Sequence, residues 1–218
     1  MAKLTTTSYG ILGLLSLRSW TTYELTEQMR RALGQFWPRA TSGIYTEPKK
    51  LVEMGLARST TEYVGERPRE RYTITPKGRR ALEAWVPTPG EGPIIEFEQL
   101  VKVFYAEHGT RADLLANLRG IREWIEDRAA GSQGIPHEYL ENRGNYPERL
   151  PWLVLGGRFL DEIEQAVDRW ATWAINEVEQ WPDDMRAATP AWDALREMAE
   201  HGDEFAARVA SRRDEGAA

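Results

Sequence analysis

The stretch LARSTTEYVGERPRERYTITPKG, residues 56–78, predicts the architecture of the first part of the chain. Residues 56–64 and 69–75 are rich in Thr, Tyr, Val and Ile, which strands favour, and side chains along such runs alternate between two faces. Gly65-Glu66-Arg67-Pro68 stands between them and has the composition of a turn. The stretch therefore predicts a β-hairpin with a basic tip.

Helical segments are expected on both sides of this hairpin. Thr21 followed by Glu24 has the pattern of a capping box, in which the hydroxyl accepts from an amide one turn later and the carboxylate reaches back. After the hairpin, Thr75 as N-cap and Pro76 as first helical residue open another helix. Three helices, a hairpin and a further helix are the parts of a winged helix-turn-helix. The expected helices span residues 4–17, 22–33, 42–54 and 76–86.

The charge of the chain changes sign after this region. Residues 1–86 contain 14 Lys and Arg against 8 Asp and Glu, a net charge of +6, whereas residues 87–218 contain 14 against 26, a net charge of −12. A basic lobe predicts a polyanionic partner, and duplex DNA is the commonest one, because Lys and Arg release its condensed counterions. The acidic remainder is expected to perform a different task.

Six short pieces stand in order in the same basic region: YGILGLL (9–15), YEL (23–25), FWP (36–38), SGIY (42–45), LVEMGL (51–56) and RYTITPKG (71–78). Together they resemble the PadR family of bacterial transcriptional regulators. The resemblance covers roughly residues 7–86 and implies a homodimeric repressor with a helical C-terminal dimerisation domain. Some members of this family release DNA when they bind small, often aromatic, effectors. The run EFEQLVKVF, residues 96–104, resembles the start of that second domain.

Two positions depart from the family pattern. Thr21-Thr22 replaces the usual His-Gly, and Thr is still a good N-cap. The usual proline directly after the Tyr of the third helix is absent, and Pro48 comes three residues after Tyr45. A proline beyond the first turn of a helix costs about 3 kcal/mol. Either the third helix begins near Thr46, or it is kinked.

Nine residues are expected to contact DNA. In a winged helix-turn-helix the third helix enters the major groove, and the hairpin touches phosphates or the minor groove. Cations and hydroxyls suit these tasks, because most protein–DNA hydrogen bonds go to the backbone of the duplex. A solvated strand face for the hairpin arginines and core packing for the tyrosine are the alternatives. The nine are Arg39, Thr41, Ser42, Tyr45, Lys49, Lys50, Arg67, Arg69 and Arg71.

The second part of the chain reads as helical throughout, and six of the nine tryptophans lie in it. Leu160 to Trp181 keeps a near-heptad apolar seam, which favours pairing with another helix. Trp152, Trp170 and Trp173 could line a pocket for a flat aromatic effector, or belong to the core or a dimer seam. The pattern favours the second interpretation for Trp170 and Trp173, and it leaves Trp152, which lies in a Pro-rich turn, open between the two.

The predicted fold class is mainly α with a small β-hairpin. It comprises a winged helix-turn-helix DNA-binding domain over residues 1–86, a linker PTPGEGP over residues 87–93, and an all-α dimerisation and effector domain over residues 94–218. We expect a cytoplasmic homodimeric repressor that binds a palindromic operator in double-stranded DNA and responds to a small effector. The alternative is a protein–protein adaptor that uses the winged fold without binding DNA.

Other function classes find little support in the residues. The chain has no cysteine, which excludes disulfides and thiolate sites. His108, His137 and His201 lack metal-ligand spacing, and Gly156-Gly157-Arg158 is only a fragment of a phosphate loop. We therefore expect no enzyme activity, metal or cofactor. No membrane-spanning run or signal peptide is expected either.

Overall fold

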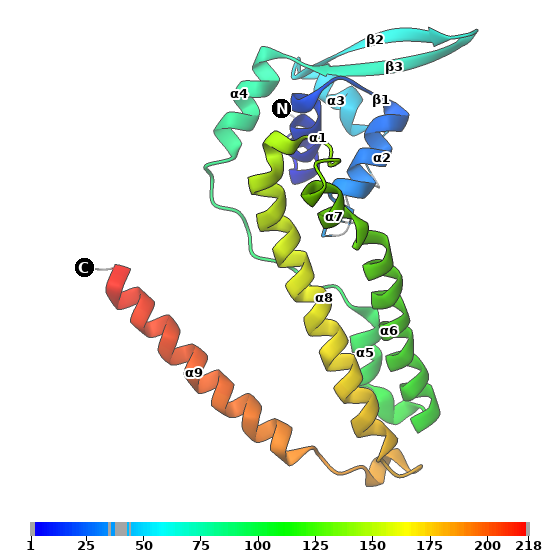
Figure 1. Ribbon diagram of the computed structural model, residues 1–218, viewed down its shortest axis with the longest axis vertical. Coiled ribbons are helices and arrows are strands. Elements are labelled where there is room, and N and C mark those ends of the chain that lie inside the picture. Colours follow the sequence, from blue (N-terminus) through cyan, green and yellow to red (C-terminus); the bar gives the residue numbers. More distant parts are fainter. Residues whose placement is uncertain (1–2, 35, 38–42, 44, 217–218) are drawn as a thin grey trace. The chain divides into compact units, whose positions relative to one another are not determined.

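The computed structural model describes residues 3–34, 36–37, 43 and 45–216, and within these it leaves out the side chains of residues 64, 67 and 216. The chain divides into two compact units, Met1–Ile94 and Ile95–Ala218. The fold is mainly helical with a small antiparallel sheet, as the sequence predicts. Figure 1 shows the order of the elements.

The first unit is a winged helix-turn-helix. A three-stranded antiparallel sheet in the order β1-β3-β2 packs against the helices, and the far part of its hairpin reaches beyond them (Figure 1). The hairpin pairs Ala57 with Ile74 at one end and Val64 with Arg67 at the turn, where Gly65 has a positive φ of 62°. The elements are α1 (Thr6–Leu17), β1 (Trp20–Thr21), α2 (Thr22–Ala32), α3 (Glu47–Glu53), β2 (Ala57–Val64), β3 (Arg67–Ile74) and α4 (Pro76–Trp85).

Local signals explain most of these boundaries. Thr21 and Glu24 form the expected capping box at the start of α2, and the Thr75 hydroxyl accepts from the Gly78 amide at the start of α4. The third helix is shorter than residues 42–54. It begins at Glu47 with Thr46 as N-cap, so Pro48 falls in the first turn, where it breaks no intrahelical hydrogen bond. The first of the two alternatives for Pro48 is therefore correct.

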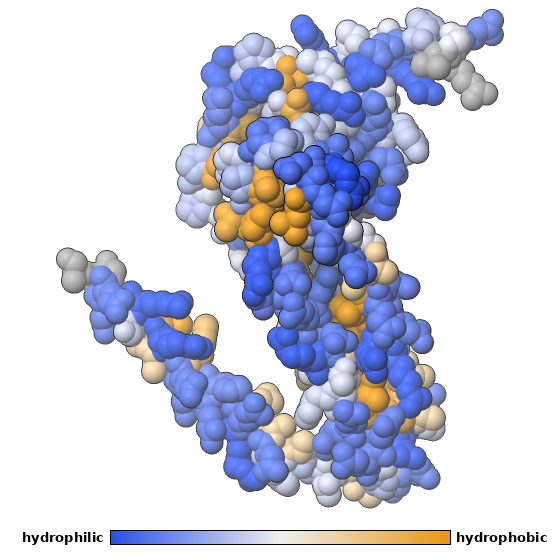
Figure 2. Space-filling view, in the orientation of Figure 1, coloured by the Kyte–Doolittle hydropathy of each residue, from blue (hydrophilic) through white to orange (hydrophobic). Residues whose placement is uncertain are grey.

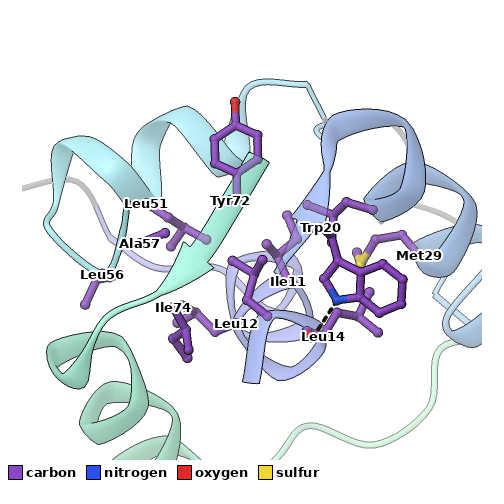
Figure 3. Close-up of a cluster of buried hydrophobic side chains, with 12 residues drawn as sticks. Ile11, Leu12, Leu14, Trp20, Met29, Leu51, Leu56, Ala57, Tyr72 and Ile74 are labelled. Atoms are coloured by element: carbon purple, nitrogen blue, oxygen red, sulfur yellow. Dashed lines mark hydrogen bonds between the residues drawn. The ribbon is translucent and has the colours of Figure 1, made fainter. Parts of the chain in front are cut away.

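One continuous core joins the three helices to the sheet (Figure 3). Trp20 is almost completely buried, and its indole Nε1 donates to the Leu14 carbonyl at 2.8 Å. Trp20 also pairs with Tyr72 across β1 and β3, so this residue connects the base of the hairpin to α1. The buried set is Ile11, Leu12, Leu14, Leu15, Trp20, Leu25, Met29, Leu51, Leu56, Ala57, Tyr72 and Ile74.

The second unit is built from helices. α6 and α8 pack along each other, and the buried residues of α8 lie in its last third, between Ala171 and Val178. Arg128 of α6 and Glu164 of α8 form an ion pair of 2.7 Å that is largely shielded from water. None of the helices in the described part of the chain is long and apolar enough to span a membrane. The helices are α5 (Glu98–Phe104), α6 (Arg111–Ser132), α7 (Gly134–Leu140), α8 (Leu150–Glu179) and α9 (Trp192–Gly216).

Large apolar side chains stay exposed on several of these helices, α8 and α9 among them. The first half of α8 exposes Trp152, Leu155 and Phe159, and α9 exposes Met198 and Phe205. Figure 2 shows apolar atoms reaching the surface along the helices of this unit. Large contiguous patches of exposed apolar surface are one feature of sites that contact another molecule.

Candidate nucleic-acid interface

A hollow of about 580 Å³ lies on the first unit between the start of α2, the beginning of α3 with Tyr45 shortly before it, and β3 from Pro68 to Tyr72. Three of the predicted DNA contacts, Tyr45, Lys49 and Arg69, line it together. The Tyr45 side chain is 65% exposed, so core packing does not account for this residue. The full lining is Thr21, Thr22, Tyr23, Tyr45, Lys49, Pro68, Arg69, Glu70 and Tyr72.

The two cations of this hollow are available to a ligand. Neither Lys49 nor Arg69 forms an ion pair with any carboxylate that the structure describes. Arg69 stands opposite Glu62 in the hairpin register, but the Glu62 carboxylate accepts from Arg71 Nε at 2.7 Å instead. Two positive charges with phenol hydroxyls beside them form a surface that suits phosphate oxygens.

Two other predicted contacts are held by carboxylates. Lys50 donates to Glu47, one turn earlier on α3, with 3.1 Å between Nζ and Oε1. Arg71 lies between Glu62 and Glu24 and also donates to the Ser19 carbonyl at 3.2 Å. Its side chain is 28% exposed. Lys50 and Arg71 are thus paired with carboxylates of the same chain, whereas Lys49 and Arg69 are not paired with any that the structure describes, although the residue pattern predicts DNA contact for all four.

Hydrogen bonds and charges at this place shift the pKa values of Arg71 and Glu24. The hydrogen bond to Glu62 raises the pKa of Arg71 further above its ordinary value. The pKa of Glu24 lies below its usual range, chiefly because its carboxylate accepts from the Thr21 amide, with the nearby Arg71 and Arg18 charges adding to the effect. Both groups therefore stay ionised at neutral pH, and their opposite charges connect β3 with the start of α2 under those conditions.

The side chains of the other four predicted DNA contacts lie outside the part of the chain that the structure describes. Arg39, Thr41 and Ser42 lie outside the described residues. Arg67 begins β3, but its side chain is also outside the described part.

The first unit is similar in sequence to known proteins. Residues 11–84 match the Transcriptional regulator PadR-like family. The first unit carries a PadR-like domain. The Negative transcriptional regulator PadR of Bacillus subtilis (strain 168) is 37% identical over 79 residues, which is 36% of this chain and 43% of that protein. The match thus spans less than half of the length of this curated relative.

Solved structures extend the likeness to a larger share of the chain. Bacillus subtilis PadR in complex with operator DNA covers 80% of this chain and 99% of its own, with a TM-score of 0.64 and 25% identity. The same protein in complex with p-coumaric acid covers 79% and 98%, with a TM-score of 0.58 and 24% identity. The Vibrio cholerae virulence activator AphA covers 80% and 98%, with a TM-score of 0.58 and 27% identity.

Sequence reasoning missed several residues around the hollow of the PadR-like domain. Tyr23, Thr22 and Glu70 line the hollow, and Tyr23 is largely exposed. One signal could have found Tyr23: it lies off the Leu25–Met29 stripe that α2 buries. Glu70 gave no such signal, because its carboxylate accepts from Thr61 across the hairpin and the register decides that pairing.

The three candidate effector tryptophans of the second unit are not brought together within one chain. Trp152 and Trp170 are 18 residues apart on α8, or about 27 Å at the rise of an α-helix. Trp170 packs edge-on against Phe97, with ring centroids 6.3 Å apart, at the border of the core. Trp152 and Trp173 are exposed. Within the described residues, no group of three or more His, Asp or Glu is placed to hold a metal ion.

Proposed function

We propose that this chain is a DNA-binding transcriptional regulator of the PadR type that represses from an operator in double-stranded DNA. The observation that carries the proposal is the hollow in which Tyr45, Lys49 and Arg69 meet, because these residues come from the third helix region and from the hairpin. Those are the two elements with which winged helices hold a duplex. Likeness to a PadR structure with operator DNA over 80% of the chain supports it.

Within this proposal Lys49 and Arg69 hold phosphates, and Tyr45 stands at the edge of the major groove. Arg39, Thr41, Ser42 and Arg67 stay candidates from the sequence. Repression is the proposed direction of control, since the curated relative with 37% identity is named a negative regulator. AphA, which is named an activator, supports the opposite direction at lower identity.

We further propose that the regulator acts as a homodimer on a palindromic operator in the cytoplasm. The exposed apolar residues of α8 and α9 are the surface that a second copy would cover. Two-fold symmetry in the protein then matches two half-sites about 34–36 Å apart. A dimer would also matter for the tryptophans, because Trp152 is far from Trp170 and Trp173 within one chain. An effector site that includes Trp152 together with Trp170 or Trp173 must therefore take them from different copies.

A small aromatic effector is the finer part of the proposal. It rests on the p-coumaric acid complex of Bacillus subtilis PadR and on the exposed tryptophans of α8. An effector at the dimer interface would alter the distance between the two recognition helices. A change of a few ångströms would then prevent both helices from engaging their half-sites.

The test is a binding titration with the full chain. A labelled duplex from the region upstream of the chain's own reading frame and a scrambled duplex of equal composition are titrated at several salt concentrations. We expect tighter binding to the first duplex and an affinity for both that falls steeply with salt. A protein that binds neither duplex in a salt-dependent way would be an adaptor rather than a DNA reader.

A further inference from the structure

Glu47, the first residue of α3, makes one contact with α1 and one within α3. Its Oε2 accepts from the Ser8 hydroxyl of α1 at 2.6 Å, and its Oε1 accepts from Lys50 Nζ at 3.1 Å. The Glu47 side chain is 15% exposed and that of Lys50 is 25% exposed. A carboxylate is thus held near the surface that would face DNA, with both of its oxygens occupied.

The contact with Ser8 ties α3 to the beginning of α1. Ser8 is fully buried, and its Oγ accepts from the Thr5 amide at 2.9 Å in the capping box of α1. A hydroxyl has one proton to donate, and here that proton goes to Glu47. The start of α1 and the start of α3 therefore share one hydrogen-bonded chain, which fixes the position of the recognition helix.

The contact with Lys50 separates two neighbouring lysines. Lys49 lines the hollow and has no carboxylate partner among the residues that the structure describes, whereas Lys50 is neutralised by Glu47. Contacts between lysine and phosphate strengthen binding to any duplex alike. Withholding one such contact lowers the affinity for random DNA, while base contacts still favour the operator.

We propose that Glu47 is a specificity-determining residue that positions α3 through Ser8 and withholds Lys50 from phosphates. The inference rests on the proposed function, because it concerns the balance between operator and random DNA. It predicts that removing the charge of Glu47 makes the protein bind random duplex more tightly and discriminate less.

The test compares two matched variants with a duplex enriched by repeated selection on the full chain and with a scrambled duplex. Glu47→Gln should raise the affinity for the scrambled duplex about eightfold near 0.1 M salt and steepen the salt slope by about 0.9, the values for one added phosphate contact. The gain for the selected duplex should be smaller. Glu53→Gln is the control, since it removes the same charge from an exposed residue of α3 that forms no ion pair among the described residues. It should change the affinity about twofold or less.

Two further variants separate the roles of the two contacts. Lys50→Ala in the Glu47→Gln background should abolish the gain, because Lys50 is the cation released. Glu47→Asp keeps the charge but shortens the reach to Ser8, so it should weaken binding to the selected duplex with an unchanged salt slope. Ser8→Ala should do the same.

Three outcomes overturn the inference: equal effects of Glu47→Gln and Glu53→Gln, a gain that survives Lys50→Ala, or unchanged binding to the selected duplex by Glu47→Asp. Failure of the proposed function looks different, since the wild-type chain would then show no salt-dependent binding to either duplex, and the inference would fall with it.

Discussion

Substitution by alanine should lower a different property at each of two hairpin arginines, DNA affinity at Arg69 and stability at Arg71. Arg69 and Arg71 are two residues apart on β3 and face the same side of the sheet. Arg69 is exposed and has no carboxylate partner within the described parts of the chain, while Arg71 contacts Glu62, Glu24 and the Ser19 carbonyl. We expect Arg69→Ala to weaken DNA binding and Arg71→Ala to weaken the fold.

The magnitudes follow from these surroundings. Loss of one phosphate contact at Arg69 should flatten the salt slope by about 0.9 and lower the affinity for any duplex about eightfold near 0.1 M salt. The ion pairs of Arg71 are partly exposed and screened by water, so their loss should cost about 1 kcal/mol in the free energy of unfolding. For a domain of this size that lowers the Tm by about 4–8 °C. The salt slope of Arg71→Ala should stay unchanged.

Fluorescence anisotropy with a labelled duplex at four salt concentrations measures the slope, and thermal unfolding followed by circular dichroism measures the Tm. Both variants are compared with the wild type in the same buffer. If Arg71→Ala flattens the slope as much as Arg69→Ala does, Arg71 leaves its carboxylates to bind DNA, and the assignment from the free structure is wrong.

Further predictions concern stability, pH and assembly. A Cβ on Gly78 would lie 2.1 Å from a backbone carbonyl oxygen, so Gly78→Ala should lower the free energy of unfolding in urea by about 2 kcal/mol or more. Gly13→Ala, where the Cβ meets nothing within 4 Å, should raise it by about 0.5–1 kcal/mol, and a loss there would contradict the reasoning. The pKa of Glu24 is lowered in the folded state, so its stabilisation is present above the ordinary value of 4.5 and disappears as the pH falls through the folded pKa. Urea unfolding between about pH 3 and 7 should show this decline, and Glu24→Gln should show a shallower one. Phe205→Asp on the exposed stripe of α9 should weaken self-association in sedimentation experiments, whereas Glu200→Lys on the opposite side of that helix should not.

Local signals were enough to predict the fold of the first unit. The hairpin, the Thr21 cap and the Thr75-Pro76 start all depend on residues close together in the chain, and each is confirmed. The turn of the hairpin is shorter than expected, because β3 begins at Arg67 rather than Arg69 and only Gly65-Glu66 separates the strands. The two-residue strand β1 was missed, because Trp20–Thr21 is too short to leave a periodic pattern. The start of α3 was left between two alternatives, because Pro48 is acceptable only in a first turn and the sequence does not say where that turn begins.

The candidate site was harder to predict than the fold, because partner choice is not local. Glu24 and Arg71 are 47 residues apart, and only the packing of α2 against the sheet brings them together. The pair of Glu47 and Lys50, in contrast, has the i, i+3 spacing of helical ion pairs and could have been recognised from the sequence. The structure places Trp152 and Trp170 on one helix, 18 residues or about five turns apart, so both lie on the same face of α8. Sequence periodicity gives no information about which chain covers that face.

The 14 Lys and Arg of residues 1–86 therefore overstate the number of cations that this domain can offer to a duplex. Glu24, Glu47 and Glu62 each lie against a cation that the residue pattern alone would assign to DNA or to solvent. Those pairs fix α3 and β3 and remove their charges from the field at the surface. What remains beside the hollow is Lys49 and Arg69, which come from two different elements. A duplex can engage both only when the helix and the hairpin are correctly spaced, so the acidic residues make binding depend on geometry more than on total charge.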